Sequence, residues 1–286
     1  MSRVPPDSSL EPLWVKSKTY MIPFRVISDI ARSNHLLRLL VKRDLSGRYR
    51  RAYLSYGWSV LEPLLLAVVY SFIFNILVGS SDSNYTIKII IGVIAWSLFA
   101  RSLTTSSNSI SNSINLFQFA RVPKIVFATS GAITNLVLAI ISLSSLIPFI
   151  YFYDLDIGFS MMGMIFWLFF LCFTGWSIGL MLAPISCSIP DVQNLVNFVV
   201  RAGFFFSPIM WTYDMFSSRF GEGIYSYIAH CNPTVIPITK MRDSMLGEAS
   251  SIPEYGYIIC ILISLISFIF GTIIFERKSH KAVINV

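Results

Sequence analysis

Charged residues are scarce in this chain of 286 residues: Lys, Arg, Asp and Glu make up only 13% of it. Soluble domains carry about 25% charged residues, so the composition excludes an ordinary water-soluble globule. Hydrophobic residues make up 55%, and 23 Phe, 13 Tyr and 6 Trp are among them. This apolar surplus also excludes a disordered chain, because disordered chains lack the apolar surface that drives folding.

Motifs for catalysis and metal binding are also missing. The four cysteines lie far apart without CxxC or Cys/His spacing, so neither a disulfide framework nor a metal site is indicated. No G-x-x-x-x-G-K-S/T phosphate loop or H-E-x-x-H motif occurs. We therefore expect a chain that is not an enzyme and binds no cofactor or metal. The three histidines are isolated, and we expect His230 to lie at a surface or a membrane interface.

Long runs without charge are the main feature that is present. A membrane-spanning helix needs about 20 mostly apolar residues. Four charge-free runs meet this length, at residues 63–81, 125–153, 157–190 and 255–275. Residues 87–103 and 192–211 add two spans with few charges. The run from Ile157 is too long for one straight helix, and we expect Pro184 and Pro190 to break its far end. The predicted fold is an all-α integral membrane protein with six transmembrane helices.

The basic residues predict the orientation of these spans, because Lys and Arg favour the cytoplasmic side. Eleven of the 22 Lys and Arg precede the first span, which places the amino terminus inside. Six spans return the carboxyl terminus to the cytoplasm, where Arg277, Lys278 and Lys281 follow the last helix. Topology and anionic lipid thus explain the net charge of +7, and nucleic acid need not be a partner. The first apolar run begins beyond residue 55, so we see no signal peptide.

Three segments do not fit a simple span. Residues 23–45 place Ile27, Ile30, Leu37 and Leu40 on one helical side, which predicts an amphipathic interface helix; a solvated basic arm is the alternative. Residues 102–120 are uncharged and rich in Ser, Thr and Asn. This composition predicts a protein-facing extension of the second span followed by a short helix, with a flexible linker as the alternative. Residues 212–254 contain only half-length apolar pieces, which predict re-entrant or interfacial helices or, equally, a soluble outer cap.

Ionisable and aromatic residues inside the spans are candidates for function. Glu62 near the inner end of the first span fits a residue at headgroup level. Arg201 either snorkels or faces a polar cavity. Aromatic rings can stack on the apolar faces of sugars, although most aromatics in membrane helices are core or belt residues. The candidate residues for such a translocation path are Tyr70, Phe74, Arg201, Phe204, Phe205, Phe206 and Trp211.

Four stretches resemble a known family. They are RDLSGRYRRAYLSYGWSVLEPLLLAVVYSFIF from Arg43, NLFQFARVPKIVFATSGAI from Asn115, FFFSPIMWTYDMF from Phe204 and NPTVIPITKMRDSMLG from Asn232. In this order they resemble the membrane permeases of type-2 ABC exporters, in particular those for capsular polysaccharide, O-antigen and teichoic acid. The resemblance covers nearly the whole chain from about Leu36.

The resemblance implies partners that the motifs alone do not reveal. Such permeases form a homodimer with two separate ATPase subunits, which bind ATP and Mg, and they export a glycan linked to polyprenyl pyrophosphate across the bacterial cytoplasmic (inner) membrane. The chain then divides into a cytoplasmic segment with the interface helix (residues 1–55), a transmembrane domain (56–276) and a cytoplasmic tail (277–286). Residues 212–254 would be re-entrant helices at the outer exit.

The resemblance also implies roles for individual residues. Residues 114–124 resemble the coupling helix that contacts the ATPase, and its candidate contacts are Asn115, Leu116, Phe117, Gln118, Phe119, Arg121, Pro123 and Lys124. We expect Arg48, Arg50 and Arg51 to meet the pyrophosphate, since arginine pairs well with phosphate oxygens; anchoring at the inner surface is an equal alternative.

Two other classes of protein are compatible with parts of the sequence. A permease for a drug or a small lipid would share all four stretches. A membrane-embedded transferase would need paired carboxylates or a His/Asp pair near one interface. Asp154 and Asp156 are close in sequence but lie in a short outer loop without partners.

Overall fold

The computed structural model describes residues 19–48, 57–78, 84–119, 122–153, 158, 160–221, 223–250 and 252–284. Within these ranges every regular element is a helix and none is a strand. The predicted all-α class is therefore confirmed. The predictions for Arg50, Arg51 and Arg121 concern residues outside the described part of the chain.

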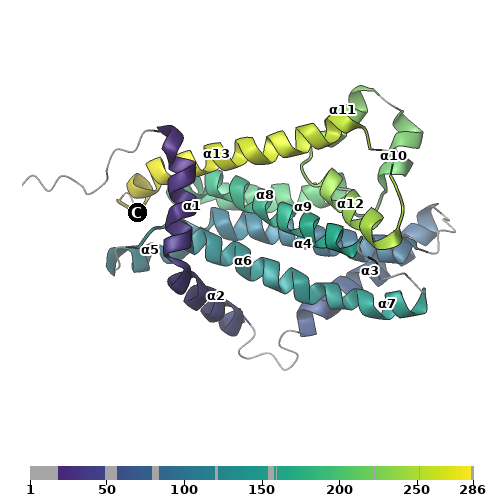
Figure 1. Cartoon of the computed structure of the whole chain (residues 1–286), viewed down its shortest axis with the longest axis horizontal. Helices are drawn as coiled ribbons and strands as arrows, with labels where there is room; N and C mark the ends of the chain where they lie inside the picture. The colour runs from purple at the N-terminus through teal and green to yellow at the C-terminus, as the bar shows by residue number, and fades with distance from the viewer. Residues whose placement is uncertain are drawn as a thin grey trace, which may run out of the picture.

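The long helices lie side by side and form a bundle (Figure 1). They are α3 (Gly57–Val78), α4 (Tyr85–Ser107), α6 (Ile125–Ser142), α8 (Met161–Ser188) and α13 (Glu254–Ile284). The turn η2 (Leu143–Leu146) and α7 (Ile147–Phe152) continue α6. Four helical stretches of the described residues are long and apolar enough to cross a membrane: Tyr85–Ser107, Ile125–Phe152, Met161–Ser188 and Glu254–Ser279. The protein is therefore a multi-pass membrane protein.

The first and fifth predicted spans are not among these four stretches. The first corresponds to α3, which has 22 residues and is apolar over the part Gly57–Ile73. The fifth corresponds to α9 (Asp191–Phe206), which has 16 residues. It ends at Phe206 and not at Trp211 as expected, because Ser207 precedes Pro208 and adopts an extended conformation with ψ of 152°.

The predicted break between the fourth and fifth spans is present, but only one of the two prolines makes it. Pro190 lies between α8 and α9, as expected. Pro184 lies inside α8, which continues to Ser188, so the expectation that Pro184 breaks the helix is wrong. A proline removes one backbone hydrogen bond and crowds the preceding turn. Here α8 packs against α4 and α13, and this packing holds the helix together.

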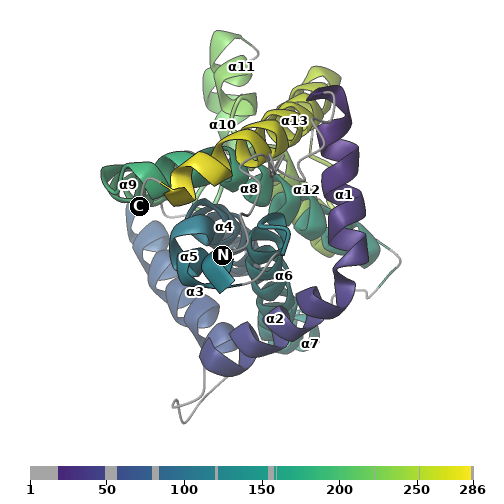
Figure 2. The same ribbon diagram turned by 90° about the vertical axis from the view of Figure 1, so that its left-hand side faces the viewer.

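The predicted amphipathic interface helix is two helices, α1 (Ile22–Arg32) and α2 (Asn34–Arg48), separated at Ser33. Figures 1 and 2 show α1 crossing one end of the bundle, with α2 turning away from it. The bend allows α1 to pack on α13 and α2 to pack on α6. Val26, Leu37 and Leu40 are buried, which excludes a solvated arm over these residues. Ile27 is 53% exposed and does not belong to the buried face.

The polar stretch after the second span is helical, and its described serines mostly face protein. Five of its serines are buried: Ser102, Ser106, Ser107, Ser109 and Ser113. Helix α5 (Ser109–Phe119) continues from α4 after Asn108. The predicted short helix is therefore confirmed, the protein-facing extension is confirmed over Ser102 to Ser113, and a flexible linker is excluded over Ser102 to Phe119.

Small residues bring α8 close to α4. A Cβ atom on Gly179 would lie 2.6 Å from the Leu103 carbonyl oxygen, and one on Gly175 would lie 2.7 Å from that of Phe99. Such close backbone contact through small residues is typical of membrane helices, where burial of apolar surface does not by itself drive association.

Three short helices follow α9: α10 (Tyr213–Phe220), α11 (Ile224–His230) and α12 (Val235–Leu246). They lie at the end of the bundle opposite to α1, α5 and the end of α13 (Figure 1). Helix α12 packs against α8 and α4, and most of its side chains are buried.

Candidate functional site

Two of the predicted path residues join an aromatic cluster between three helices. The ring of Phe204 on α9 lies 5.3 Å from Tyr70 on α3 and 6.5 Å from Trp96 on α4, measured between centroids. Gly203 makes room for this contact, because a Cβ atom there would lie 2.7 Å from Cη2 of Trp96. Aromatic pairs in this distance range contribute about 0.5–1.5 kcal/mol each. Trp96 was not predicted, although an indole in an otherwise aliphatic run is a visible signal.

Other predicted path residues on α9 are exposed. Phe205 and Phe206 are 69% and 76% exposed. Arg201 on the same helix is also exposed. Within the described part of the chain it forms no ion pair. Helix α9 therefore presents an outer face of aromatic rings with one cation.

The remaining candidates for the path are Trp211 and Phe74. The Trp211 ring packs on Phe216 of α10 at 5.5 Å, and its Nε1–H donates to the Phe205 carbonyl at 3.4 Å. Phe74 lies in α3, and its side chain is outside the described set.

Glu62 has a partner that the sequence did not reveal. Nη2 of Arg101 on α4 donates to the Glu62 carboxylate at 2.7 Å. The Glu62 side chain is 48% exposed and that of Arg101 is 35% exposed, so the pair contributes about 0–1 kcal/mol. They line a groove of about 670 Å³ between α3 and α4 together with Trp58, Leu65, Leu66, Thr104 and Thr105.

Arg242 on α12 is the most deeply buried cation of the described residues. Its guanidinium donates to the backbone carbonyls of Lys88 at 2.9 Å, Ile209 at 2.9 Å and Trp211 at 3.1 Å. Burial lowers the pKa of Arg242 to about 10, so the side chain remains charged at neutral pH. The three bonds connect α12 to the start of α4 and to the segment after α9.

A network of charges continues from this arginine. Asp243 accepts from Nζ of Lys240 at 2.7 Å and from the Ser250 hydroxyl at 2.6 Å. Nζ of Lys88 pairs with Glu248 at 3.0 Å. Sequence reasoning used this stretch only for its resemblance to a family. The signal it missed was a group of charges next to an apolar half-span, which need partners when they are buried.

The expectation that His230 lies at the protein surface is wrong. The side chain is fully buried, and its Nδ1 lies 2.6 Å from the Ser226 carbonyl oxygen. Its ring packs edge-on against Tyr213 and Tyr255, each at 5.4 Å. Helix α11 thus joins the start of α13 through this histidine.

The predicted coupling segment begins in α5 and ends at the start of α6. Asn115 to Phe119 lie in the last part of α5, whose side chains there are outside the described set. Pro123 is exposed. Nζ of Lys124 donates to the Ser279 carbonyl of α13 at 3.1 Å, and burial lowers the pKa of this lysine. Lys124 therefore connects the segment to the end of α13.

The predicted pyrophosphate contacts are described only in part. Arg48 is the last residue of α2, and its side chain is outside the described set. Arg50 and Arg51 lie outside the described residues.

Comparison with known proteins gives a consistent result. Two relatives from Klebsiella pneumoniae, each an O-antigen export system permease protein RfbA, are 25% and 26% identical over 252 and 255 residues, covering 86% of this chain and 93% of each relative. A protein of the same name from Myxococcus xanthus is 25% identical over 259 residues, covering 86% of this chain and 95% of the relative. Residues 35–246 match the family model described as ABC-2 type transporter. The chain therefore belongs to the ABC-2 type transporter family.

Proposed function

We propose that this chain is the permease subunit of an ATP-driven exporter of lipid-linked, O-antigen-type polysaccharide. The observation that carries the proposal is the similarity over nearly the whole chain to three permeases named for O-antigen export. The sequence contains no phosphate loop of its own. A separate ATPase subunit therefore binds ATP and Mg and supplies the energy, and two copies of this chain form the conduit.

Six spans in the bacterial cytoplasmic membrane, with both termini inside, agree best with the arrangement of the helices. The end of the bundle with α1, α5 and the end of α13 (Figure 1) also carries the basic residues Arg32, Arg38, Arg277 and Lys278. Lys and Arg near span ends favour the cytoplasm, so this end faces inward. Helices α3 and α9 then complete six crossings, and the buried α12 enters the outer half of the bundle as a re-entrant helix.

The exposed face of α9 supports a path for sugar rings. Phe205 and Phe206 present aromatic faces beside Arg201, and no other part of the described chain covers them. A second copy with its own α9 opposite would enclose this face, and α3 would form a side of the same path through Tyr70. Sugar rings stack on aromatic planes by their C–H faces, so a polymer can slide along such a wall. A carrier pyrophosphate would first meet Arg48, Arg50 and Arg51 at the inner surface.

The end of α5 is suited to couple the permease to the ATPase. Helix α5 packs against α6, α8 and α13, so a displacement of its C-terminal end would be transmitted to three long helices. ATP binding can drive export only if it favours one state of the permease over another. We assign this role to the segment that contains Phe117, Phe119 and Arg121.

Complementation of a deletion strain tests both the cargo and the coupling. Deletion should cause lipid-linked glycan to accumulate in the cytoplasm, and the wild-type chain should restore export. The variant Phe117→Ala should bind the ATPase and leave the glycan inside. The control Asn112→Ala changes an exposed residue of the same helix, outside the predicted coupling segment, and should export normally. Normal surface glycan in the deletion strain would point to a drug or small-lipid cargo.

A further inference from the structure

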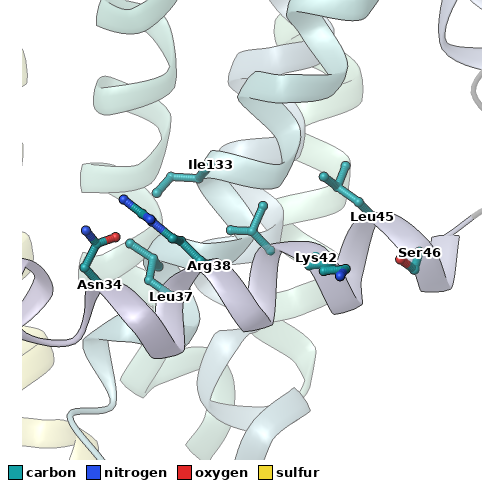
Figure 3. A pocket seen from close by; sticks show the side chains of 8 residues that line it. Asn34, Leu37, Arg38, Lys42, Leu45, Ser46 and Ile133 are labelled. Carbon is teal, nitrogen blue, oxygen red and sulfur yellow. The ribbon is translucent and has the colours of Figure 1, made fainter.

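A groove at the cytoplasmic end of the bundle carries an inference that does not depend on the cargo. The α2–α6 groove has a volume of about 450 Å³. Its lining residues are Asn34, Leu37, Arg38, Val41, Lys42, Leu45, Ser46 and Ile133 (Figure 3). All except Ile133 come from one side of α2, at spacings of three and four residues. With a rise of about 1.5 Å per residue, the groove follows α2 for roughly 18 Å.

The groove is amphiphilic. Leu37 is buried at its base, and Val41 and Leu45 are half-buried beside it. Arg38 and Lys42 are exposed and lie one helical turn apart (Figure 3). None of the described residues that line the groove is a carboxylate. It therefore offers an apolar surface with two positive charges.

Among the described residues, the two cations of the groove differ from their neighbours on the same segment, which form ion pairs. Arg43 pairs with Asp44 at 2.8 Å, and Arg25 with Asp29 at 3.6 Å. Within the described part of the chain, Arg38 and Lys42 form no ion pair or hydrogen bond. Two free cations beside an apolar surface at a membrane interface complement a lipid with an anionic headgroup, since basic pockets next to membrane helices bind such headgroups.

We propose that the α2–α6 groove binds one anionic phospholipid of the inner leaflet. Its phosphodiester lies between Arg38 and Lys42, and the first part of one acyl chain covers Leu37, Val41 and Ile133. The volume is that of a small-ligand site, enough for a headgroup phosphate and the first part of one acyl chain. The groove also lies on a different side of the bundle from α9 (Figure 2), which separates it from the proposed path. The lipid contacts both α2 and α6 and thereby stabilises the packing of α2 on the bundle.

Native mass spectrometry of the purified full-length chain in detergent tests this proposal, with phosphatidylglycerol or phosphatidylcholine added. The wild type should retain phosphatidylglycerol in preference to phosphatidylcholine. Because each basic residue near a lipid surface is worth about 1 kcal/mol, Arg38→Gln and Lys42→Gln should each weaken binding about fivefold, and the double variant about 30-fold. Arg38→Lys keeps the charge and should bind within about twofold of the wild type.

The control is Arg43→Gln, which removes a paired arginine of the same helix outside the groove and should leave binding unchanged. An equal loss with this control would show general attraction of lipid to a basic helix and overturn the site. Equal retention of phosphatidylcholine and phosphatidylglycerol by the wild type would also overturn it. A polyprenyl pyrophosphate that displaces phosphatidylglycerol at lower concentration would identify the carrier lipid as the occupant and refute our assignment. All substituted residues are exposed, and size-exclusion elution verifies that the variants fold.

Discussion

Replacement of Arg242 by methionine tests the arrangement of α12 directly. Methionine keeps an unbranched stem of similar reach and removes the guanidinium, so the main change is the loss of three hydrogen bonds to backbone carbonyls. The carbonyls belong to Lys88, Ile209 and Trp211, which are far from Arg242 in sequence. Loss of the three hydrogen bonds should therefore loosen α12 from α4 and from the segment after α9.

The size of the effect follows from the three acceptors. A buried acceptor that loses its partner costs about 1–3 kcal/mol. The Lys88 carbonyl lies in the first turn of α4 and keeps its place in the helical bond pattern, and removal of a buried charge recovers part of its desolvation cost. We therefore take about 1 kcal/mol, the lower end of this range, as the cost of each lost hydrogen bond. The three bonds together then lower the free energy of unfolding by about 3 kcal/mol. At about 2–4 °C per kcal/mol, the unfolding temperature should fall by about 6–12 °C.

Thermal unfolding in detergent, followed by tryptophan fluorescence, measures this shift. Arg219→Met is the matched control, because Arg219 is an exposed arginine on the nearby α10. A surface substitution of this kind changes stability by about 0.5 kcal/mol or less, so its unfolding temperature should move by less than about 2 °C. If Arg242→Met unfolds within that same range of the wild type, the three bonds do not hold α12 and our reasoning is refuted.

Further substitutions test the helix contacts and the proposed path. Gly179→Leu should abolish a monodisperse peak in size-exclusion chromatography, because a Cβ atom at this position would lie 2.6 Å from the Leu103 carbonyl oxygen. The control Gly47→Ala should elute like the wild type, because a Cβ atom there has no neighbouring atom within 4 Å. Phe204→Ala should lower the free energy of unfolding by about 3 kcal/mol through the loss of its packing and ring contacts, as measured by thermal unfolding. Phe206→Ala should change stability by about 0.5 kcal/mol or less, because the ring is exposed, yet reduce export in the complementation assay if α9 lines the path. Normal export by Phe206→Ala would remove this residue from the proposed path.

Local patterns of residues were sufficient to predict most of the helices. Apolar runs of bilayer length are visible without any tertiary information, because each must satisfy its backbone hydrogen bonds within its own helix. The runs at 125–153 and 255–275 correspond closely to the spans in the structure. The serine-rich extension of α4 was also predictable, because uncharged polar residues inside a span need protein neighbours.

The sequence alone thus determined the helical class and, through its quoted stretches, the family. Three of its four charge-free runs, together with the run at 87–103, are the four long apolar stretches of the described residues. Only the tertiary structure decided the partners of Glu62 and Arg242, the burial of His230 and the bend between α1 and α2. These features depend on residues distant in the chain, as when Arg242 meets a carbonyl of Lys88, 154 positions away. A backbone carbonyl that accepts such a bond leaves no mark on residue identity, so no local pattern can reveal it. Pro184 is a case in which the local pattern was misleading. A proline tends to break a helix, but contacts with α4 and α13 keep α8 continuous.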